Sequence, residues 1–210
     1  MKSNKMKSRN NIKYFYNPKN NNSKNSGFKN NYYNTIAPGY DELYMEEQLK
    51  KLNLIKKTID EENVLREFRN PKNLLDIGCG SGISTRFFAN TFKIKNIMGI
   101  DPSKELLKIA KEKDPNGKYI ICDAEQINHL QQIKKFDIII SITAIQNFHN
   151  INLALQNIKS LGKNFVLTFL KKSTKKEIIE RNIKKTFFVI KRIEEDKDII
   201  FFCKQKTQII

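Results

Sequence analysis

Three glycines fall within five positions, at Gly78, Gly80 and Gly82, just after an apolar run that contains Asp76. Glycine tolerates positive φ and lets the backbone approach a ligand closely, and the start of the following helix offers unpaired N–H groups. The spacing is GxGxG, whereas a dinucleotide site has GxGxxG and would need glycine at Ile83. A carboxylate at Asp76 would repel a pyrophosphate but would favour an ammonium group.

Two further aspartates follow the next two predicted strands. Asp101 closes one strand in MGIDPS, where it could accept hydrogen bonds from two ribose hydroxyls. Asp123 closes the other in IICDAEQ, where it could accept from an adenine amino group, and the N–H of Ala124 could bond an adenine ring nitrogen. A ligand with an amino acid at one end, ribose in the middle and adenine at the other end fits this order. S-adenosylmethionine is that ligand.

Alternating strands and helices must position these side chains. We expect strands at 73–77, 96–100, 118–122, 136–141, 164–170, 187–193 and 198–204. We expect an amphipathic helix over 41–59, helices at 81–91, 103–113, 150–161 and 174–185, and a short one near 125–130. Strands separated by helices predict a parallel α/β sheet with helices on both faces. The last two strands are joined only by EEDKD, so they must form a hairpin and one late strand must run antiparallel.

The stretches LLDIGCGSG, GIDPS, CDAE and FDIIISI resemble successive motifs of the class I S-adenosylmethionine-dependent methyltransferases, from about Tyr33 to the C-terminus. The resemblance implies a Rossmann-like, seven-stranded, mostly parallel sheet with a C-terminal antiparallel hairpin. It also implies a set of cofactor-binding residues, namely Tyr40, Asp76, Gly78, Cys79, Gly80, Asp101, Pro102, Asp123, Ala124 and Ser141. In many members an aromatic residue before the sheet closes over the cofactor. Tyr40 is the first candidate here and Tyr33 the second, although both could simply pack the first helix.

Ser141–His149, after the fourth strand, is the predicted acceptor site. Methyl transfer from a sulfonium is an in-line displacement, which alignment and desolvation can accelerate without an acid–base pair. The Asn/Asp-Pro-Pro-aromatic stretch of amine and amide methyltransferases is absent here. SITAIQNFH instead resembles the guanine-N7 methyltransferases of small-subunit ribosomal RNA, with Asn147 in place of their usual tryptophan. Gln146 and Asn147 could read a base edge, and His149 is a base, a donor to the substrate or a solvent-facing turn residue.

The net charge of +17 is unevenly distributed. Residues 1–31 carry eight Lys or Arg and no acid, and their Asn- and Lys-rich composition predicts a disordered basic tail before a methyltransferase domain at 32–210. The remaining residues hold 31 bases against 22 acids. This excess favours RNA as a partner, although drift towards Lys and Asn could produce part of it. The segment Lys171–Lys176 could hold phosphates or form a solvated loop.

Two alternatives to an RNA methyltransferase stay open. A small-molecule methyltransferase would need an apolar acceptor pocket without a basic rim. A non-catalytic subunit of an RNA-modifying complex would not need the intact cofactor motifs that this chain has. Some RNA-methylating relatives require a small activator protein, and such a partner also stays open for this chain.

Apolar runs and cysteines indicate the cellular compartment and whether a metal is bound. No run approaches the roughly 18 apolar residues of a membrane span, and no secretory signal is visible. Three scattered cysteines without a CxxC pair support neither disulfides nor a metal site. We therefore expect a cytoplasmic protein without metal.

Overall fold

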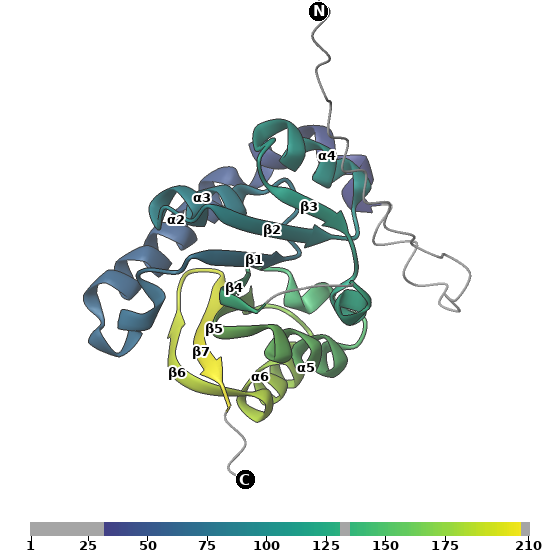
Figure 1. Ribbon diagram of the computed structural model, residues 1–210. Coiled ribbons are helices and arrows are strands. Elements are labelled where there is room, and N and C mark those ends of the chain that lie inside the picture. Colours follow the sequence, from purple (N-terminus) through teal and green to yellow (C-terminus); the bar gives the residue numbers. More distant parts are fainter. Residues whose placement is uncertain (1–31, 131–134, 207–210) are drawn as a thin grey trace, which may run out of the picture.

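The computed structural model of the chain describes residues 32–130 and 135–206 (Figure 1). The predicted basic tail, 1–31, lies outside the described residues. Residues 32–36 are helical and lead into a short 3-10 turn and then the first long helix.

The seven predicted strands are present and form one sheet. They are β1 (Asn73–Ile77), β2 (Asn96–Asp101), β3 (Lys118–Ile121), β4 (Phe136–Ser141), β5 (Gly162–Leu170), β6 (Phe187–Glu194) and β7 (Asp198–Gln205). Their order is β3-β2-β1-β4-β5-β7-β6. The first five strands pair in parallel, and β7 runs antiparallel between β5 and β6. The Rossmann-like fold and the terminal hairpin are confirmed.

The described residues also form five helices of nine residues or more and four 3-10 turns. The helices are α2 (Tyr40–Glu61), α3 (Ile83–Thr91), α4 (Lys104–Lys113), α5 (Ile151–Leu161) and α6 (Lys176–Thr186). The 3-10 turns are η2 (Ala37–Gly39), η3 (Asn63–Phe68), η4 (Ala124–His129) and η5 (Ile145–Asn147). Of these, α2, η2 and η3 precede the sheet. Helix α3 begins two residues later than predicted, because Gly82 adopts φ 78° and belongs to the bend. The turn η3 was not expected from the sequence.

Side-chain alternation along the central strands creates a core on each face of the sheet. In β4, Ile138 and Ile140 pack with buried residues of α2 and α3, whereas Ile139 faces the core that contains α5 and α6. In Figure 1, α2 and α3 cover one side of the sheet, and α5 and α6 cover the other. This double cover explains why the central strands read as continuous apolar runs.

The order of the strands reverses between β1 and β4, so the chain leaves these neighbouring strands in opposite directions. Ser141 links the ends of β4 and β1 here, since its Oγ donates to the carbonyl of Ile77 at 3.0 Å. Ligands of open α/β sheets bind at such a switch point, beyond the carboxyl ends of the strands. Among the described residues, no helix combines the length and apolar character that crossing a membrane requires.

Candidate functional site

A cavity of about 750 Å³ opens at this switch point. It is lined by Tyr33, Tyr40, Gly78, Gly80, Asp101, Pro102, Leu106, Cys122, Asp123, Ala124, Glu125, Ile142, Thr143, Ala144, Asn147, Phe148 and His149. The lining residues come from the ends of β1, β2, β3 and β4 and from the segment before the sheet, so five separate stretches of chain meet there.

The glycine bend forms one wall. Gly78 and Gly80 adopt φ values of 73° and 54°, a region that side chains other than glycine rarely occupy. The bend is tied to β2, because the N–H groups of Gly78 and Cys79 both donate to Ile100 O, at 2.8 and 3.0 Å. A Cβ on Gly78 would lie 2.5 Å from the Cβ of Ala144, so the bend also packs directly against the loop after β4. Glycine is therefore required here by both conformation and space.

Asp101 joins the bend to the start of α4. Its Oδ2 accepts from Gly80 N at 2.9 Å, and its Oδ1 accepts from Ser103 N at 2.8 Å. Each oxygen keeps a second lone pair for a ligand. Burial raises the pKa of this carboxyl to about 6, although the two backbone hydrogen bonds lower it. Two donors on a ligand would stabilise the ionised form.

Asp76 lies behind the bend and does not line the cavity. Its Oδ2 accepts from Ser84 Oγ at 2.6 Å and from Thr85 Oγ1 at 2.7 Å. Its Oδ1 is buried and has no hydrogen-bond partner among the described residues. Burial raises the pKa of Asp76 to about 6 as well. A buried acceptor without a donor is costly in the free protein.

Asp123 and Ala124 form the far wall, where β3 ends and η4 begins. Burial raises the pKa of Asp123, nearby Glu125 raises it further, and His149 lowers it. Glu125 is held in place because its Oε1 accepts from Asn150 N at 2.9 Å. The cavity is therefore lined by the carboxylates of Asp101, Asp123 and Glu125 and by the exposed residue His149.

The segment before the sheet covers the cavity with tyrosines. The rings of Tyr33 and Tyr40 meet edge to face with centroids 6.4 Å apart. Burial raises the pKa of both hydroxyls, so both stay protonated at neutral pH. Asn34 fastens this segment to α4, because its Oδ1 accepts from Ser103 Oγ at 2.8 Å and Glu105 N at 3.3 Å.

The loop after β4 forms the wall next to the glycine bend. It separates the three predicted acceptor residues. Asn147 and His149 line the cavity, and Asn147 Nδ2 donates to Tyr33 Oη at 3.0 Å. Gln146 does not line it. Its Nε2 donates to Thr143 O at 2.6 Å, and its Oε1 is buried without a partner among the described residues. Thr143, which lies within the predicted stretch Ser141–His149 but was given no role of its own, also lines the cavity.

Seven of the ten residues predicted to bind the cofactor line the cavity, namely Tyr40, Gly78, Gly80, Asp101, Pro102, Asp123 and Ala124. The other three lie behind its walls. Cys79 is buried with Tyr119 of β3, Ser141 bonds the end of β1, and Asp76 is sealed below the bend. Direct ligand contact by these three stays a prediction. Among the described residues, no group of His, Cys, Asp or Glu could hold a metal ion.

Comparison with known proteins finds similarity to methyltransferases. Residues 75–164 match the family model described as "Methyltransferase domain". The malonyl-[acyl-carrier protein] O-methyltransferase of Bacillus cereus is 26% identical over 190 residues, which are 83% of this chain and 67% of that protein. The chain spans about half the length of the first curated relatives that it matches, 59% of one and 43% of another.

Solved structures share the fold. An S-adenosylmethionine-dependent methyltransferase from Clostridium acetobutylicum superposes with a TM-score of 0.63 at 15% identity, covering 83% of this chain and 99% of that one. A Haloferax volcanii structure, the complex between the Trm112 methyltransferase activator and a methyltransferase, gives a TM-score of 0.62 at 14% identity. That match covers 83% of this chain and 98% of that one.

Proposed function

We propose that the chain is a class I S-adenosylmethionine-dependent methyltransferase, which its similarity to such proteins supports. It methylates an acceptor held against the loop Ile142–His149, and this acceptor is RNA. The observation that carries the proposal is the shared cavity. The carboxylates after β2 and β3 and the polar side chains after β4 line one space of about 750 Å³.

The residues present fit the cofactor. Asp101 has free lone pairs for two ribose hydroxyls, Asp123 and Ala124 N stand where adenine would be read, and Tyr40 covers the middle. A Cβ on Gly80 would point towards Tyr40 and Leu106, at 3.7 Å from each, so glycine leaves this part of the cavity open. When bound, S-adenosylmethionine supplies a methyl group on a positively charged sulfur. The acidic walls suit such a cationic ligand.

The acceptor side of the cavity holds groups that orient rather than deprotonate. Asn147 lines the cavity, and besides the N–H that it donates to Tyr33 Oη it keeps a second N–H and its side-chain oxygen. Gln146 does not line the cavity, and its Nε2 donates to Thr143 O. We therefore assign recognition of a base edge to Asn147 in preference to Gln146. A ring nitrogen with a free lone pair, such as guanine N7, loses no proton during methylation. Such an acceptor needs alignment and exclusion of water from the cavity, which this loop can provide.

The basic segment supports RNA because it adjoins the acceptor loop. Lys175 Nζ donates to Phe148 O at 2.8 Å, which places the start of α6 beside the loop that lines the cavity. Lys171, Lys172 and Lys176 share this segment and could contact phosphates, which position a nucleic acid without reading its sequence. Together with the eight bases of residues 1–31, they support a polyanionic partner.

The test uses the full chain, isotope-labelled S-adenosylmethionine and RNA from a strain that lacks the protein, with methylated nucleosides measured by mass spectrometry. We expect a single methylated guanine. Asn147→Ala should reduce the rate at least tenfold at unchanged cofactor affinity, and His149→Ala should reduce it less. The pH–rate profile tests the role of His149. If the rate depends on a group that titrates near neutrality, and His149→Ala abolishes this dependence, His149 acts as a base and the ring-nitrogen acceptor is contradicted. Binding of NADH without binding of S-adenosylmethionine would refute the assignment as a whole.

A small-molecule acceptor is the second candidate. The hydrogen bond between Asn147 and Tyr33 joins two residues that line the cavity, and together they could hold a small planar molecule. The B. cereus relative is named for a carrier-bound malonyl group, which is a small acceptor. Labelled methyl groups in a small-molecule extract, with none in RNA, would favour this candidate.

An activator and a cytoplasmic location are the remaining proposals. The H. volcanii neighbour was solved together with its activator, so we propose that RNA methylation be assayed with and without an activator of that kind. The cytoplasmic location stays a prediction from the sequence.

A further inference from the structure

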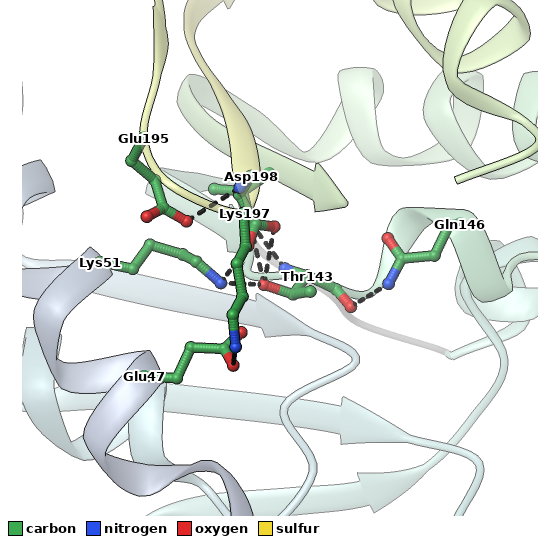
Figure 2. A network of polar contacts seen from close by, with 8 residues as sticks. Glu47, Lys51, Thr143, Gln146, Glu195, Lys197 and Asp198 are labelled. Atoms are coloured by element: carbon green, nitrogen blue, oxygen red, sulfur yellow. Dashed lines mark hydrogen bonds and ion pairs between the residues drawn. The ribbon is translucent and has the colours of Figure 1, made fainter. Parts of the chain in front are cut away.

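A buried ion pair lies beneath the acceptor loop (Figure 2). Lys51 of α2 and Asp198 at the start of β7 have side chains that are 1% and 0% exposed, and their Nζ and Oδ2 atoms lie 2.5 Å apart. The same ammonium donates to Thr143 Oγ1 at 2.6 Å, and that hydroxyl donates to Asp198 Oδ1 at 3.0 Å. Three segments that are distant in sequence therefore meet at one hydroxyl on the cavity wall.

Thr143 is held in a strained conformation by these contacts. Its φ is 55°, which is unfavourable for a β-branched residue. Its N–H donates to Thr168 Oγ1 at 2.7 Å, and its carbonyl accepts from Gln146 Nε2 at 2.6 Å. Every polar group of Thr143 is thus bonded. A strained residue that is fixed on all sides at a ligand cavity indicates that its conformation matters for function.

Stability alone does not account for the ion pair. Removing two charges from water is costly, and apolar residues of similar size often stabilise a protein at least as well. The two charged groups instead fix the position of the Thr143 hydroxyl through directional hydrogen bonds, which apolar side chains could not make. The turn η5 couples Asn147 to the residue that follows Thr143, because Asn147 N donates to Ala144 O at 2.9 Å.

Helix α2 extends this coupling to the cofactor side. Tyr40, which lines the cavity, begins the helix that carries Lys51 eleven residues later, about 16 Å along the axis. The hairpin turn docks on the same helix a second time, because Lys197 Nζ lies 2.5 Å from Glu47 Oε2 on the surface. Figure 2 shows both pairs bridging α2 and the β6–β7 turn.

We propose that Lys51 and Asp198 are positioning residues for methyl transfer, which hold Thr143 in its left-handed conformation and so aim Asn147 and His149 into the cavity. This inference rests on the proposed function. The pair acts through Thr143 and touches no ligand.

The test compares the full-length double variant Lys51→Met/Asp198→Asn with wild type and with the control Lys197→Met. The double variant removes both charges but keeps a side-chain oxygen at position 198. The control breaks the exposed ion pair on the same hairpin. We measure hydrogen exchange of the peptide spanning 142–149, the affinity for S-adenosylmethionine by calorimetry, and kcat and KM for RNA methylation.

We expect exchange in residues 142–149 to accelerate about tenfold or more in the double variant. The kcat should fall at least tenfold, whereas the cofactor affinity should stay within twofold. A variant that merely loses stability would instead show faster exchange throughout the sheet. If exchange of this peptide and kcat both match the Lys197→Met control, the inference is wrong.

Thr143 provides a second test in case the double variant does not fold. Thr143→Ser keeps the hydroxyl and should retain at least half of the wild-type kcat, whereas Thr143→Val keeps the shape and should lose at least tenfold. Equal rates for the two variants would overturn the inference. If wild type binds no S-adenosylmethionine, the proposed function fails, but the exchange difference still decides whether the pair orders the loop.

Discussion

The two sides of the cavity are built in different ways. On the cofactor side, conformation is set by the backbone of a short motif, in which Gly78 and Gly80 bend the chain and Asp101 bonds the bend. On the acceptor side, conformation is set by side chains from distant segments, with Lys51 and Thr143 separated by 92 residues. A site made from one short motif is visible in a sequence, whereas a site assembled by long-range contacts is not.

The two sides also differ in charge. On the proposed cofactor side, Asp101 and Asp123 line the cavity, and Asp76 is buried behind the bend. The acceptor loop adjoins the basic segment Lys171–Lys176 through Lys175. A cationic cofactor and an anionic acceptor would thus approach from regions of opposite charge.

The largest expected effect is at the bend. Gly78→Ala places a Cβ 2.5 Å from Ala144 and forces a left-handed φ on alanine, so we expect cofactor affinity to fall at least a hundredfold in calorimetry. Gly39→Ala is the matched control, since nothing lies within 4 Å of the added Cβ. Full cofactor affinity in Gly78→Ala would show that the bend does not contact the ligand side of the cavity.

Asp101→Ala should have the next largest effect. The change removes an acceptor for two backbone N–H groups and for the ligand, and it should weaken cofactor binding by about 1.5–3 kcal/mol. Asp137→Ala, at the opposite end of the sheet, serves as the control. Equal affinities in calorimetry would assign Asp101 to the bend alone.

A change of pH should have a smaller effect, which concerns the free energy of unfolding. Burial raises the pKa of Asp76 and of Asp101 to about 6, above about 3.9 in an unfolded chain. The free folded protein therefore binds more protons than the unfolded chain between about pH 4 and 6. The contribution of these two groups to the free energy of unfolding declines as pH rises through that range.

Cofactor affinity should show the opposite trend, because ligand donors favour ionised carboxylates. We expect it to be about tenfold lower at pH 5 than at pH 7.5 and to level off above pH 7. Asp101→Asn should weaken this dependence. A flat affinity profile in wild type would mean that neither carboxyl changes its protonation when the cofactor binds.

The smallest expected effect on the cofactor side comes from deleting residues 1–31. Cofactor affinity and melting temperature should remain unchanged. RNA affinity should fall, and its dependence on salt should become weaker because fewer counterions are released. If the salt dependence in a filter-binding titration is the same as in wild type, the tail does not contribute to RNA binding.

The sequence by itself determined the order of elements and several residues that line the cavity on the proposed cofactor side. Short apolar runs located all seven strands. Two of them, Asn73–Ile77 and Phe136–Ser141, have the predicted boundaries. The motif around Gly78 and the positions of Asp101 and Asp123 after their strands placed three stretches at one edge of the sheet. These signals are local, since they depend on glycine conformation and on the parallel arrangement of neighbouring strands.

Only the tertiary structure decided the acceptor side. Two amides adjacent in sequence, Gln146 and Asn147, face different surroundings because the 3-10 turn directs only Asn147 into the cavity. Lys51 lies in the same helical row as the buried residue Ile55, which was a signal that a buried charge needed a partner. No spacing within α2 could identify that partner, because Asp198 reaches it only when β7 inserts between β5 and β6. Long-range pairing of this kind is set by the packing of the whole sheet.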